Sequence, residues 1–414
     1  MGQVRTGPLL VDCEDVAWFR DQADGARGAA AALGRRTGLG ERRTAELGLA
    51  VAELVTNLAK HSVDGSLLLR AVRTADTAGV EVVVVDSGPG MVDVPAARLD
   101  GVSTVGTLGI GLGAIGRLAD VFDVHSRPGH GTVQLARFWP HPVPRELSGR
   151  EPAVGGLTRP ISGERVCGDA WATRIDPHRP EGDTGETRDP ARTPTAPGAA
   201  HATPSATSWA ALTGLASPAP APGLSRSPVR PRESSRTVPV RAAAAGPGQG
   251  VMVMLCDGLG HGPMAALAGQ AAVQAFRTSD SRLPEQAMRD IHRALRGTRG
   301  AAVAVARIEP DNGRLLFCGI GNITAALITS TTRNNLLSHP GIVGHQTHVP
   351  RTYEHPLPAH GALVMHSDGL TERWTPADLS GLLTHRATVL ATGLMRQAGT
   401  RRDDASVVVA KELW

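Results

Sequence analysis

Apolar residues recur along this chain at spacings that alternate between those of helices and those of strands. Residues 15–36, rich in Ala, Arg and Leu, predict a helix. Residues 41–61 predict a second one, because their apolar residues define one helical face. Mostly apolar runs that read as strands follow at 66–72, 80–86, 121–126 and 132–138. Residues 1–140 are therefore expected to form an α/β domain.

A second domain is expected at 155–414, after a proline-containing linker at 141–154. Helices are predicted at 262–277 and 284–296, and strands at 251–257, 301–308, 314–320, 324–329, 362–368 and 405–410. Residues 177–248 are dominated by Pro, Ala, Ser, Thr, Arg and Gly. We expect them to be disordered, because few apolar residues are available to offset the entropy of ordering. Since a strand follows directly, this segment is predicted to be an insertion within the second domain.

Composition narrows the class of protein. The net charge is +4, but lysine occurs only at Lys60 and Lys411 and arginine is spread along the chain. A nucleic-acid groove would show clustered charge, so no nucleic-acid partner is expected. The four cysteines form no Cys-x-x-Cys pair, and no apolar run reaches the roughly 18–20 residues that span a bilayer. These features, together with the lack of a signal peptide, predict a cytoplasmic protein without membrane contact.

One face of the predicted helix at 41–61 carries polar residues that could bind a metal ion or take part in catalysis. Glu53, Asn57 and His61 are spaced four residues apart, which places them on one side of the helix. An amide oxygen can ligate Mg²⁺, and a carboxylate one turn away can orient or deprotonate a nucleophile. A solvated helix face gives the same pattern, and His61 is interpreted as structural.

Two glycine-containing segments follow. Asp86-Ser87-Gly88-Pro89-Gly90 ends an apolar strand, where an aspartate can accept a hydrogen bond from an exocyclic amine and glycines let a flat base approach. Residues 106–113 contain four glycines before a helix predicted at 114–120, an arrangement that exposes N–H groups to phosphate oxygens. Either segment alone is an ordinary turn or loop; their order together with the Glu-x-x-x-Asn pair is what carries the prediction.

These motifs together resemble the GHKL ATPase superfamily, and most of all its anti-sigma-factor serine kinases. The resemblance implies a Bergerat-type α/β sandwich that binds ATP with Mg²⁺. It implies that Glu53 is the general base and Asn57 the Mg²⁺ ligand. It also implies that Asp86 accepts a hydrogen bond from the exocyclic amine of adenine. The other nucleotide-binding positions that it implies are Gly88 and Gly90 in the first glycine box, Gly109, Gly111 and Gly113 in the lid, and Thr132 behind the adenine. Use of the nucleotide as a conformational switch, without phosphate transfer, remains the alternative.

Acidic residues recur beside the strands of the second domain. They are Asp169 in a Gly-Asp-x-Trp sequence, Asp257 before Gly258, Asp368 before Gly369, and the pair Asp403 and Asp404. Charges beside a core need a partner or a metal, and hard divalent cations take oxygen ligands. Each Asp-Gly pair alone is a common turn, whereas four acidic positions in order, each next to a strand, form a strong composite pattern.

This pattern resembles the protein phosphatase 2C superfamily and its sporulation stage II protein E branch. The resemblance implies a β-sandwich flanked by helices, with two Mg²⁺ or Mn²⁺ ions that activate water for direct attack on phosphorus. It implies that Asp257 bridges the ions, with the Gly258 carbonyl as a further ligand. Asp368 and Asp403 would complete the coordination of the second ion, and Asp169 would lie beside the first. Leu259 follows the Asp-Gly pair where other branches have histidine, so a protonation role for His261 stays open beside a plain loop role.

The two resemblances point to one regulatory circuit. We expect a phosphoserine or phosphothreonine phosphatase that acts on a phosphorylated anti-sigma-factor antagonist, with an ATP-binding domain that acts as kinase or nucleotide sensor. The alternative is a nucleotide-dependent module that sequesters a sigma factor or antagonist without kinase activity. A third hypothesis is an interaction hub formed by the insertion. Anti-sigma kinases are often dimers, and a homodimer is left open.

Overall fold

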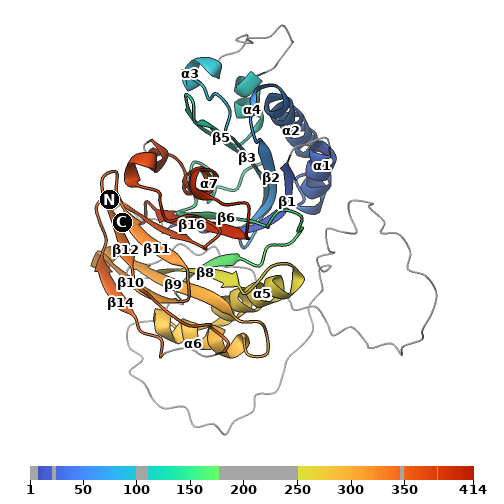
Figure 1. Cartoon of the computed structure of the whole chain (residues 1–414). Coiled ribbons are helices and arrows are strands. Elements are labelled where there is room, and N and C mark those ends of the chain that lie inside the picture. Colours follow the sequence, from blue (N-terminus) through green and yellow to red (C-terminus); the bar gives the residue numbers. More distant parts are fainter. Residues whose placement is uncertain (1–7, 21–24, 99–110, 177–249, 346–348, 380) are drawn as a thin grey trace, which may run out of the picture.

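The computed structural model describes residues 8–20, 25–98, 111–176, 250–345, 349–379 and 381–414. Three sheets and the helices between and around them are stacked in layers (Figure 1). The expected classes, a Bergerat-type α/β sandwich followed by a protein phosphatase 2C-like β-sandwich flanked by helices, are confirmed. No helix in these ranges is both long and apolar enough to cross a membrane.

The N-terminal sheet is antiparallel, with strand order β1-β2-β3-β5-β4. Its strands are β1 (Asp12–Arg20), β2 (Ser66–Arg73), β3 (Ala78–Asp86), β4 (Val121–Arg127) and β5 (Gly131–Phe138). Its helices are α1 (Ala26–Arg36), α2 (Glu41–His61), the short α3 (Val94–Ala97) and α4 (Gly111–Leu118). Leu67, Leu69, Val82 and Val84 pack toward the helices, and Leu68 and Val83 pack toward the opposite face. The apolar runs are continuous because both faces of the sheet are buried.

The helix predicted at 15–36 is wrong for residues 15–20, which belong to strand β1. This strand pairs with β2 and has a register shift between Asp15 and Ala17. Val16, Trp18 and Phe19 are β-branched or aromatic and favour a strand surface. Val16 and Phe19 pack on the helix side, whereas Trp18 reaches the C-terminal part. Helix α1 accounts only for the Ala-rich remainder of the predicted segment.

The C-terminal part is a sandwich of two sheets. One has the order β13-β10-β9-β8-β7, with β14 also paired to β10, and the other has the order β12-β11-β15-β16-β6. The strands are β6 (Val154–Arg159), β7 (Ala170–Ile175), β8 (Val251–Gly258), β9 (Ala301–Glu309), β10 (Arg314–Ile320), β11 (Thr324–Ile328), β12 (Arg333–Leu336), β13 (Ser338–His339), β14 (Tyr353–Pro356), β15 (Ala362–His366) and β16 (Ala405–Lys411). Val253, Leu255 and Phe317 from the first sheet meet Met365 and Val408 from the second in a common core.

Helices cover both outer faces of the sandwich. Helices α5 (Pro263–Thr278) and α6 (Pro284–Ala294) pack on the first sheet, with Phe276, Met288 and Ile291 fully buried. Helix α7 (Ala387–Ala398) packs on the second, and ten of its twelve residues are buried. Both predicted helices are confirmed as α5 and α6, whereas α7 was not predicted.

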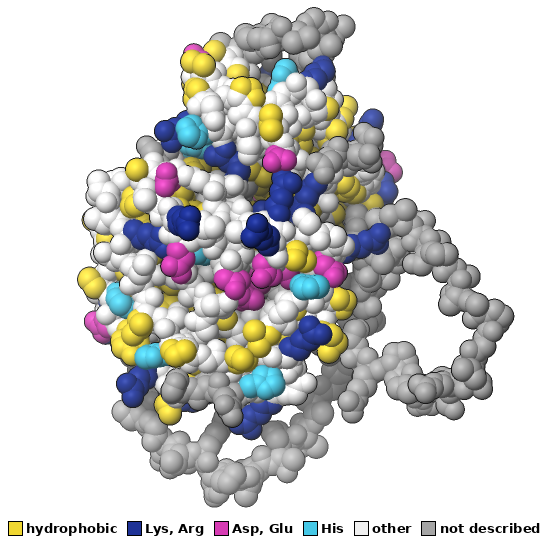
Figure 2. All heavy atoms as spheres, viewed as in Figure 1, with side chains coloured by type: hydrophobic (Ala, Val, Ile, Leu, Met, Phe, Trp, Pro, Cys, Tyr) yellow, Lys and Arg dark blue, Asp and Glu magenta, His cyan; other side chains and the backbone are white. Residues whose placement is uncertain are grey.

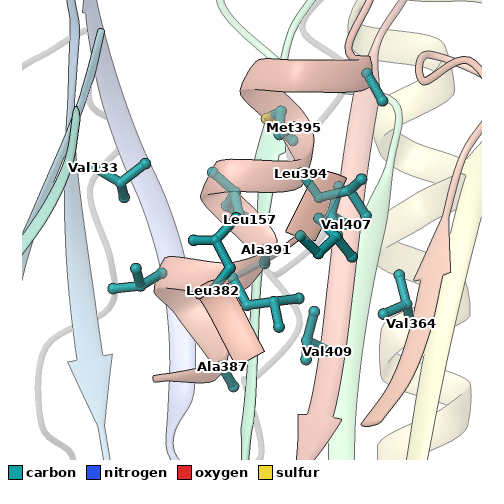
Figure 3. Close-up of a cluster of buried hydrophobic side chains, with 14 of the residues drawn as sticks. Val133, Leu157, Val364, Leu382, Ala387, Ala391, Leu394, Met395, Val407 and Val409 are labelled. Atoms are coloured by element: carbon teal, nitrogen blue, oxygen red, sulfur yellow. The ribbon is translucent and has the colours of Figure 1, made fainter. Parts of the chain in front are cut away.

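Helix α7 lies between the two halves of the protein (Figures 1 and 3). Leu390 and Leu394 belong to one buried cluster that includes Val133 from the N-terminal sheet and Leu157 and Val407 from the sandwich. The N-terminal sheet therefore has helices on both faces, and its second cover is supplied by the C-terminal part.

Polar contacts tie the same interface. Trp18 donates from Nε1 to the carbonyl of Thr158 over 2.8 Å, and the Asp15 carboxylate accepts from the Thr158 amide over 2.6 Å. The predicted linker at 141–154 contains no helix and ends where β6 begins. It is packed rather than loose, because Leu147 is buried with Leu9 in a small apolar cluster.

Candidate functional sites

The sequence-predicted acids converge from both sheets of the sandwich. Asp169 directly precedes β7 and Asp257 lies near the end of β8, and these two strands are paired. Asp368 follows β15 and Asp403 precedes β16, which are also paired. Asp257 interacts electrostatically with all three of the others, so the four carboxylates form one acidic centre. A band of Asp and Glu side chains is visible across one face of the molecule (Figure 2).

Burial and mutual repulsion govern the electrostatics of this centre. Burial, followed by the charges of the other three aspartates, raises the pKa of Asp257. Burial also raises the pKa of Asp169, and the hydroxyls of Ser367 and Ser406 only partly offset it. The pKa of Asp368 is raised by burial and then by Asp403. Carboxylates held together in this way are costly without a compensating positive charge.

The acidic centre fits divalent cations held partly by water. Asp169 is 5% exposed, and neither of its carboxylate oxygens has a hydrogen-bond partner of normal geometry. No group of three or more His, Cys, Asp or Glu side chains in the described ranges is arranged to hold one metal ion by itself. Mg²⁺ usually keeps several waters and needs only one or two carboxylates from the protein. Pairs of these aspartates therefore supply a donor set of the right chemistry.

The two adjacent aspartates before β16 differ in their surroundings. Asp404 is buried, and its carboxylate accepts from the amides of Ile161 and Gly168 over 2.7 Å each. It thus fixes the segment that leads to Asp169. Asp403 is half-buried and accepts from the Asp404 amide over 2.9 Å, which leaves its side chain to interact with Asp368 and Asp257.

Asn322, in the Gly-Asn pair after β10, contacts the acidic centre and was not among the predicted site residues. Its Nδ2 donates to Oδ2 of Asp368 over 2.6 Å. The preceding Gly321 has φ +101°, and a Cβ there would lie 2.3 Å from that of Ala302. The Gly-Asn pair after β10 could have indicated this contact. It forms the turn that leads to β11 in the other sheet, and it places an amide side chain at that turn.

Gly258 and His261 follow Asp257. Gly258 is buried at the end of β8 against the first turn of α5, and a Cβ on it would lie 2.5 Å from the carbonyl oxygen of Ala265. His261 is exposed, and its Nδ1 lies 3.4 Å from the carboxylate of Glu164. This contact, which links two loop residues, favours a loop role for His261 over a role in protonation.

The second candidate site lies in the N-terminal part. Glu53 and Asn57 are half-buried on α2, one turn apart, as the helical spacing predicted. Asp86 at the end of β3 is buried, and its Oδ1 accepts from the Gly88 amide over 2.7 Å. Burial raises the pKa of Asp86, and the amides of Gly88 and Thr132 work in the opposite direction.

The glycines beside Asp86 are needed for packing within the protein. A Cβ on Gly88 would lie 2.7 Å from the carbonyl oxygen of His61, and one on Gly90, at φ +68°, would lie 2.2 Å from that of Arg127. Thr132 is buried, with its hydroxyl 2.9 Å from that of Ser126. In the predicted lid, Gly111 and Gly113 begin α4, whereas Gly109 lies outside the described residues.

A cavity of ≈240 Å³ lies between the segment that follows β3 and helix α7. It is lined by residues of both halves, among them Ser87, His125 and Arg127 on one side and Leu382 and Arg396 on the other. Burial, followed by the charges of His385 and Arg396, lowers the pKa of His125 to about 4. The segment after β3, which the sequence predicted to bind nucleotide, therefore lies close to the helix that covers the sandwich.

Together these features define a class of protein: an ATPase-like α/β sandwich packed against a phosphatase-like β-sandwich with an acidic centre. Comparison with known families agrees. The profile of the histidine kinase-like ATPase domain matches residues 20–137, and that of stage II sporulation protein E (SpoIIE) matches residues 247–412. The chain therefore carries an N-terminal histidine kinase-like ATPase domain and a C-terminal SpoIIE domain.

Individual proteins resemble parts of the chain. The serine/threonine-protein kinase RsbT of Bacillus subtilis (strain 168) is 34% identical over 115 residues, which is 27% of this chain and 86% of RsbT. A crystal structure of RsbX in complex with magnesium is 14% identical, with a TM-score of 0.38, over 61% of this chain and 92% of RsbX. The SiaA-PP2C domain of Pseudomonas aeruginosa is 14% identical, with a TM-score of 0.37, over 63% of this chain and 84% of that domain.

Proposed function

We propose that the acidic centre removes phosphate from phosphoserine or phosphothreonine of a partner protein in a metal-dependent reaction. The observation that carries this proposal is the buried Asp169, whose carboxylate lies beside Asp257 and Asp368 and has no hydrogen-bond partner of normal geometry in the described ranges. Structural acids are normally paired, as Asp404 is here, so unpaired buried carboxylates support a metal-binding role.

Each residue has a proposed part. Asp257 contacts both neighbours and would be shared by two Mg²⁺ or Mn²⁺ ions, with the Gly258 carbonyl as a further ligand. Asp169 would hold the first ion, and Asp368 and Asp403 the second. When bound, such ions would activate water and stabilise the charge that develops on the phosphate. Asn322 holds the Asp368 carboxylate in place.

We further propose that the N-terminal domain binds ATP with Mg²⁺. Asp86 would accept from the adenine amine, and Asn57 would ligate the Mg²⁺. Glu53 would act as general base if phosphate is transferred to a protein. The glycines 88, 90, 109, 111 and 113 and Thr132 would shape the nucleotide site. The likeness to RsbT supports a serine kinase activity.

The proposed partner is a phosphorylated anti-sigma-factor antagonist in a partner-switching circuit. Support comes from the fusion itself, since a kinase-like domain and a SpoIIE domain share one chain. The proposed division is 1–140 for the ATPase domain, 141–154 for the linker and 155–414 for the phosphatase domain. The insertion at 177–248 lies outside the described residues.

The phosphatase proposal is tested by Asp257→Ala in the full chain. Mn²⁺-dependent release of phosphate from a phosphoserine peptide should fall by at least about 10³-fold, because the shared carboxylate is lost. Asp280→Ala is the matched control, since Asp280 is an exposed aspartate in the same domain. Unchanged turnover of the Asp257→Ala protein would refute the assignment of the acidic centre.

The kinase proposal is tested in the Asp257→Ala background, where product is preserved. Labelled ATP is incubated with the protein and a candidate antagonist, with and without Glu53→Ala. Transfer that disappears with Glu53→Ala supports a kinase. Nucleotide binding without transfer supports instead the module that uses ATP as a switch.

A further inference from the structure

Three arginines from different parts of the chain lie close enough for their charges to interact. Arg20, at the end of β1 in the ATPase domain, donates from Nη2 to the carbonyl of Pro160 over 3.1 Å. Arg159, at the end of β6, donates from Nη2 to the carbonyl of Thr400. The Arg20 guanidinium is therefore held next to Arg159, because Pro160 follows Arg159 in the sequence. The Arg159 guanidinium is likewise held next to Arg401, because Thr400 precedes Arg401. We call Arg20, Arg159 and Arg401 the arginine cluster.

Strand pairing and chain connectivity bring the backbone of the arginine cluster next to the proposed metal ligands. Arg159 pairs with Ala405 in the β6–β16 register, one residue beyond Asp404. Arg401 precedes Asp403 by two residues. The neighbouring Ile161 amide donates to Asp404, which fixes this edge against the acidic centre. Lys and Arg side chains are seen gathered next to the band of acids on this face (Figure 2).

The charge of Arg159 is poorly compensated by the protein. No carboxylate in the described ranges lies within ion-pair distance of its guanidinium, which is half-buried. Burial, and then the like charges of Arg20 and Arg401, lower the pKa of Arg159 to about 10. Arg401 is exposed and pairs with Asp64 over 3.0 Å, a surface contact that costs little to exchange. Such a group of guanidinium ions is suited to a doubly charged oxyanion.

We propose that the arginine cluster binds the phosphate monoester of the protein substrate, and that the ATPase domain contributes Arg20 to the phosphatase site. This inference rests on the proposed phosphatase function and adds the residues that recognise its substrate. The guanidinium groups neutralise and orient the dianion beside Asp403, and they take no part in proton transfer. They are positioning residues rather than catalytic ones. A phosphatase domain separated from its ATPase partner would lack part of this recognition.

Two readouts test the cluster in the full chain with Mn²⁺. The first is the KM and kcat for a phosphoserine peptide, and the second is the Kd of inorganic phosphate measured by calorimetry on the inactive Asp257→Ala protein. Arg20→Gln and Arg159→Gln should each raise KM and Kd about tenfold, since each removes a charge-assisted hydrogen bond, while kcat stays within about twofold. Arg20→Lys should recover part of the loss.

Arg42→Gln is the matched control, because Arg42 is an exposed arginine of the same ATPase domain and pairs only with Glu46 among the described residues. It should leave KM and Kd unchanged.

Excess ATP should leave phosphate binding unchanged, because ATP is expected at α2 and β3. Displacement of phosphate by ATP would assign the cluster to the nucleotide site and overturn the proposal.

The outcomes separate this inference from the proposed function. Unchanged KM and Kd in Arg20→Gln overturn the cluster even if the enzyme is active. Weakened phosphate binding in Arg20→Gln supports it even if Arg159→Gln fails to fold, because Arg20 lies in the other domain. A wild-type protein that binds phosphate through the cluster but hydrolyses nothing would refute the phosphatase function alone.

Discussion

Arg70 in the ATPase sheet donates a hydrogen bond of 2.6 Å from Nη2 to the carbonyl of Gly156 in the phosphatase sheet. The Arg70 side chain is fully buried and also pairs with Asp15 over 2.7 Å and with Glu81 over 3.0 Å. Burial alone would raise the pKa of Glu81, but the charges of Arg137 and Arg70 outweigh it and the pKa falls. The two domains are thus joined by a buried and largely satisfied polar network.

Replacing Arg70 should therefore destabilise the whole protein. Arg70→Ala leaves Asp15 and Glu81 buried with one cation fewer, and loss of one member of such a network costs roughly 3–5 kcal/mol. Urea unfolding followed by circular dichroism measures this change. Arg73→Ala is the control, since Arg73 pairs with Glu14 at the surface over 2.8 Å and should cost only about 0–1 kcal/mol. Equal losses for the two variants would contradict a dominant role of the buried network.

Helix α7 should couple the stability of both domains. Leu394 is fully buried in the cluster shared by α7 and both sheets, so Leu394→Ala is expected to cost roughly 2–5 kcal/mol. Hydrogen exchange should show faster opening in β5 of the ATPase domain as well as in β16. Leu49→Ala, at a position that is 51% exposed, should change stability by no more than about 0.5 kcal/mol. Exchange that accelerates only in the phosphatase sheets would argue against this coupling.

Acidification should weaken the domain interface in two steps. Burial, followed by His385 and Arg396, lowers the pKa of His125 to about 4. A histidine with a lowered folded pKa is protonated first in the unfolded chain, so stability falls as pH drops from about 6.5 to 4. The second step arises from Asp123. Burial opposes its ionisation, but hydrogen bonds from His385 and from the Arg386 amide lower its pKa to about 2.

The Asp123 contribution is present above its unfolded pKa of about 4 and is lost as pH falls toward 2, a change on the order of 2 kcal/mol. Urea midpoints recorded from pH 7 to pH 2.5 measure both steps. Asp123→Asn should flatten the lower one, whereas Asp76→Asn, at an exposed site, should leave the profile as in the wild type. A profile for Asp123→Asn that superimposes on that of the wild type would exclude Asp123 as the source.

Asn322 should set the metal requirement through Asp368. Asn322→Ala removes the 2.6 Å hydrogen bond that orients this carboxylate, and loss of such an outer contact typically weakens metal binding by about 10–100-fold. The Mn²⁺ concentration for half-maximal activity should rise accordingly, with most activity regained at saturating metal. Asn312→Ala is the control, because Asn312 bonds Glu309 at a distant turn. An unaltered metal requirement in Asn322→Ala would mean that the amide does not orient the ligand.

Local pattern was sufficient to predict most strands and the order of the acidic motifs. The acids could be placed because each adjoins a strand end, and paired strands bring their ends together. Residues 15–20 were assigned to a helix because they lead into the Ala- and Arg-rich segment of α1, while the strand with which they pair lies some 50 residues later. Helix α7 was missed because its small and β-branched residues, buried nearly all round, give little amphipathic periodicity.

The parts that could not be predicted depend on contacts between distant segments. Asp404 and Asp403 are neighbours in sequence, and only the amides of Ile161 and Gly168 distinguish the structural residue from the candidate ligand. The arginine cluster likewise joins residues from three separate regions. Single-residue patterns carry no information on such pairings, because nothing in the local spacing marks which backbone group will face which side chain.

The position of α7 also bears on how the chain is synthesised. The ATPase sheet is complete at residue 138, yet the helix that covers its second face emerges from the ribosome roughly 250 residues later. At a translation rate of about 5–20 residues per second, the apolar side of this sheet stays uncovered for tens of seconds. A nascent chain in this state exposes an aggregation-prone apolar surface. We expect chaperones to shield this surface until residues 387–398 have been synthesised.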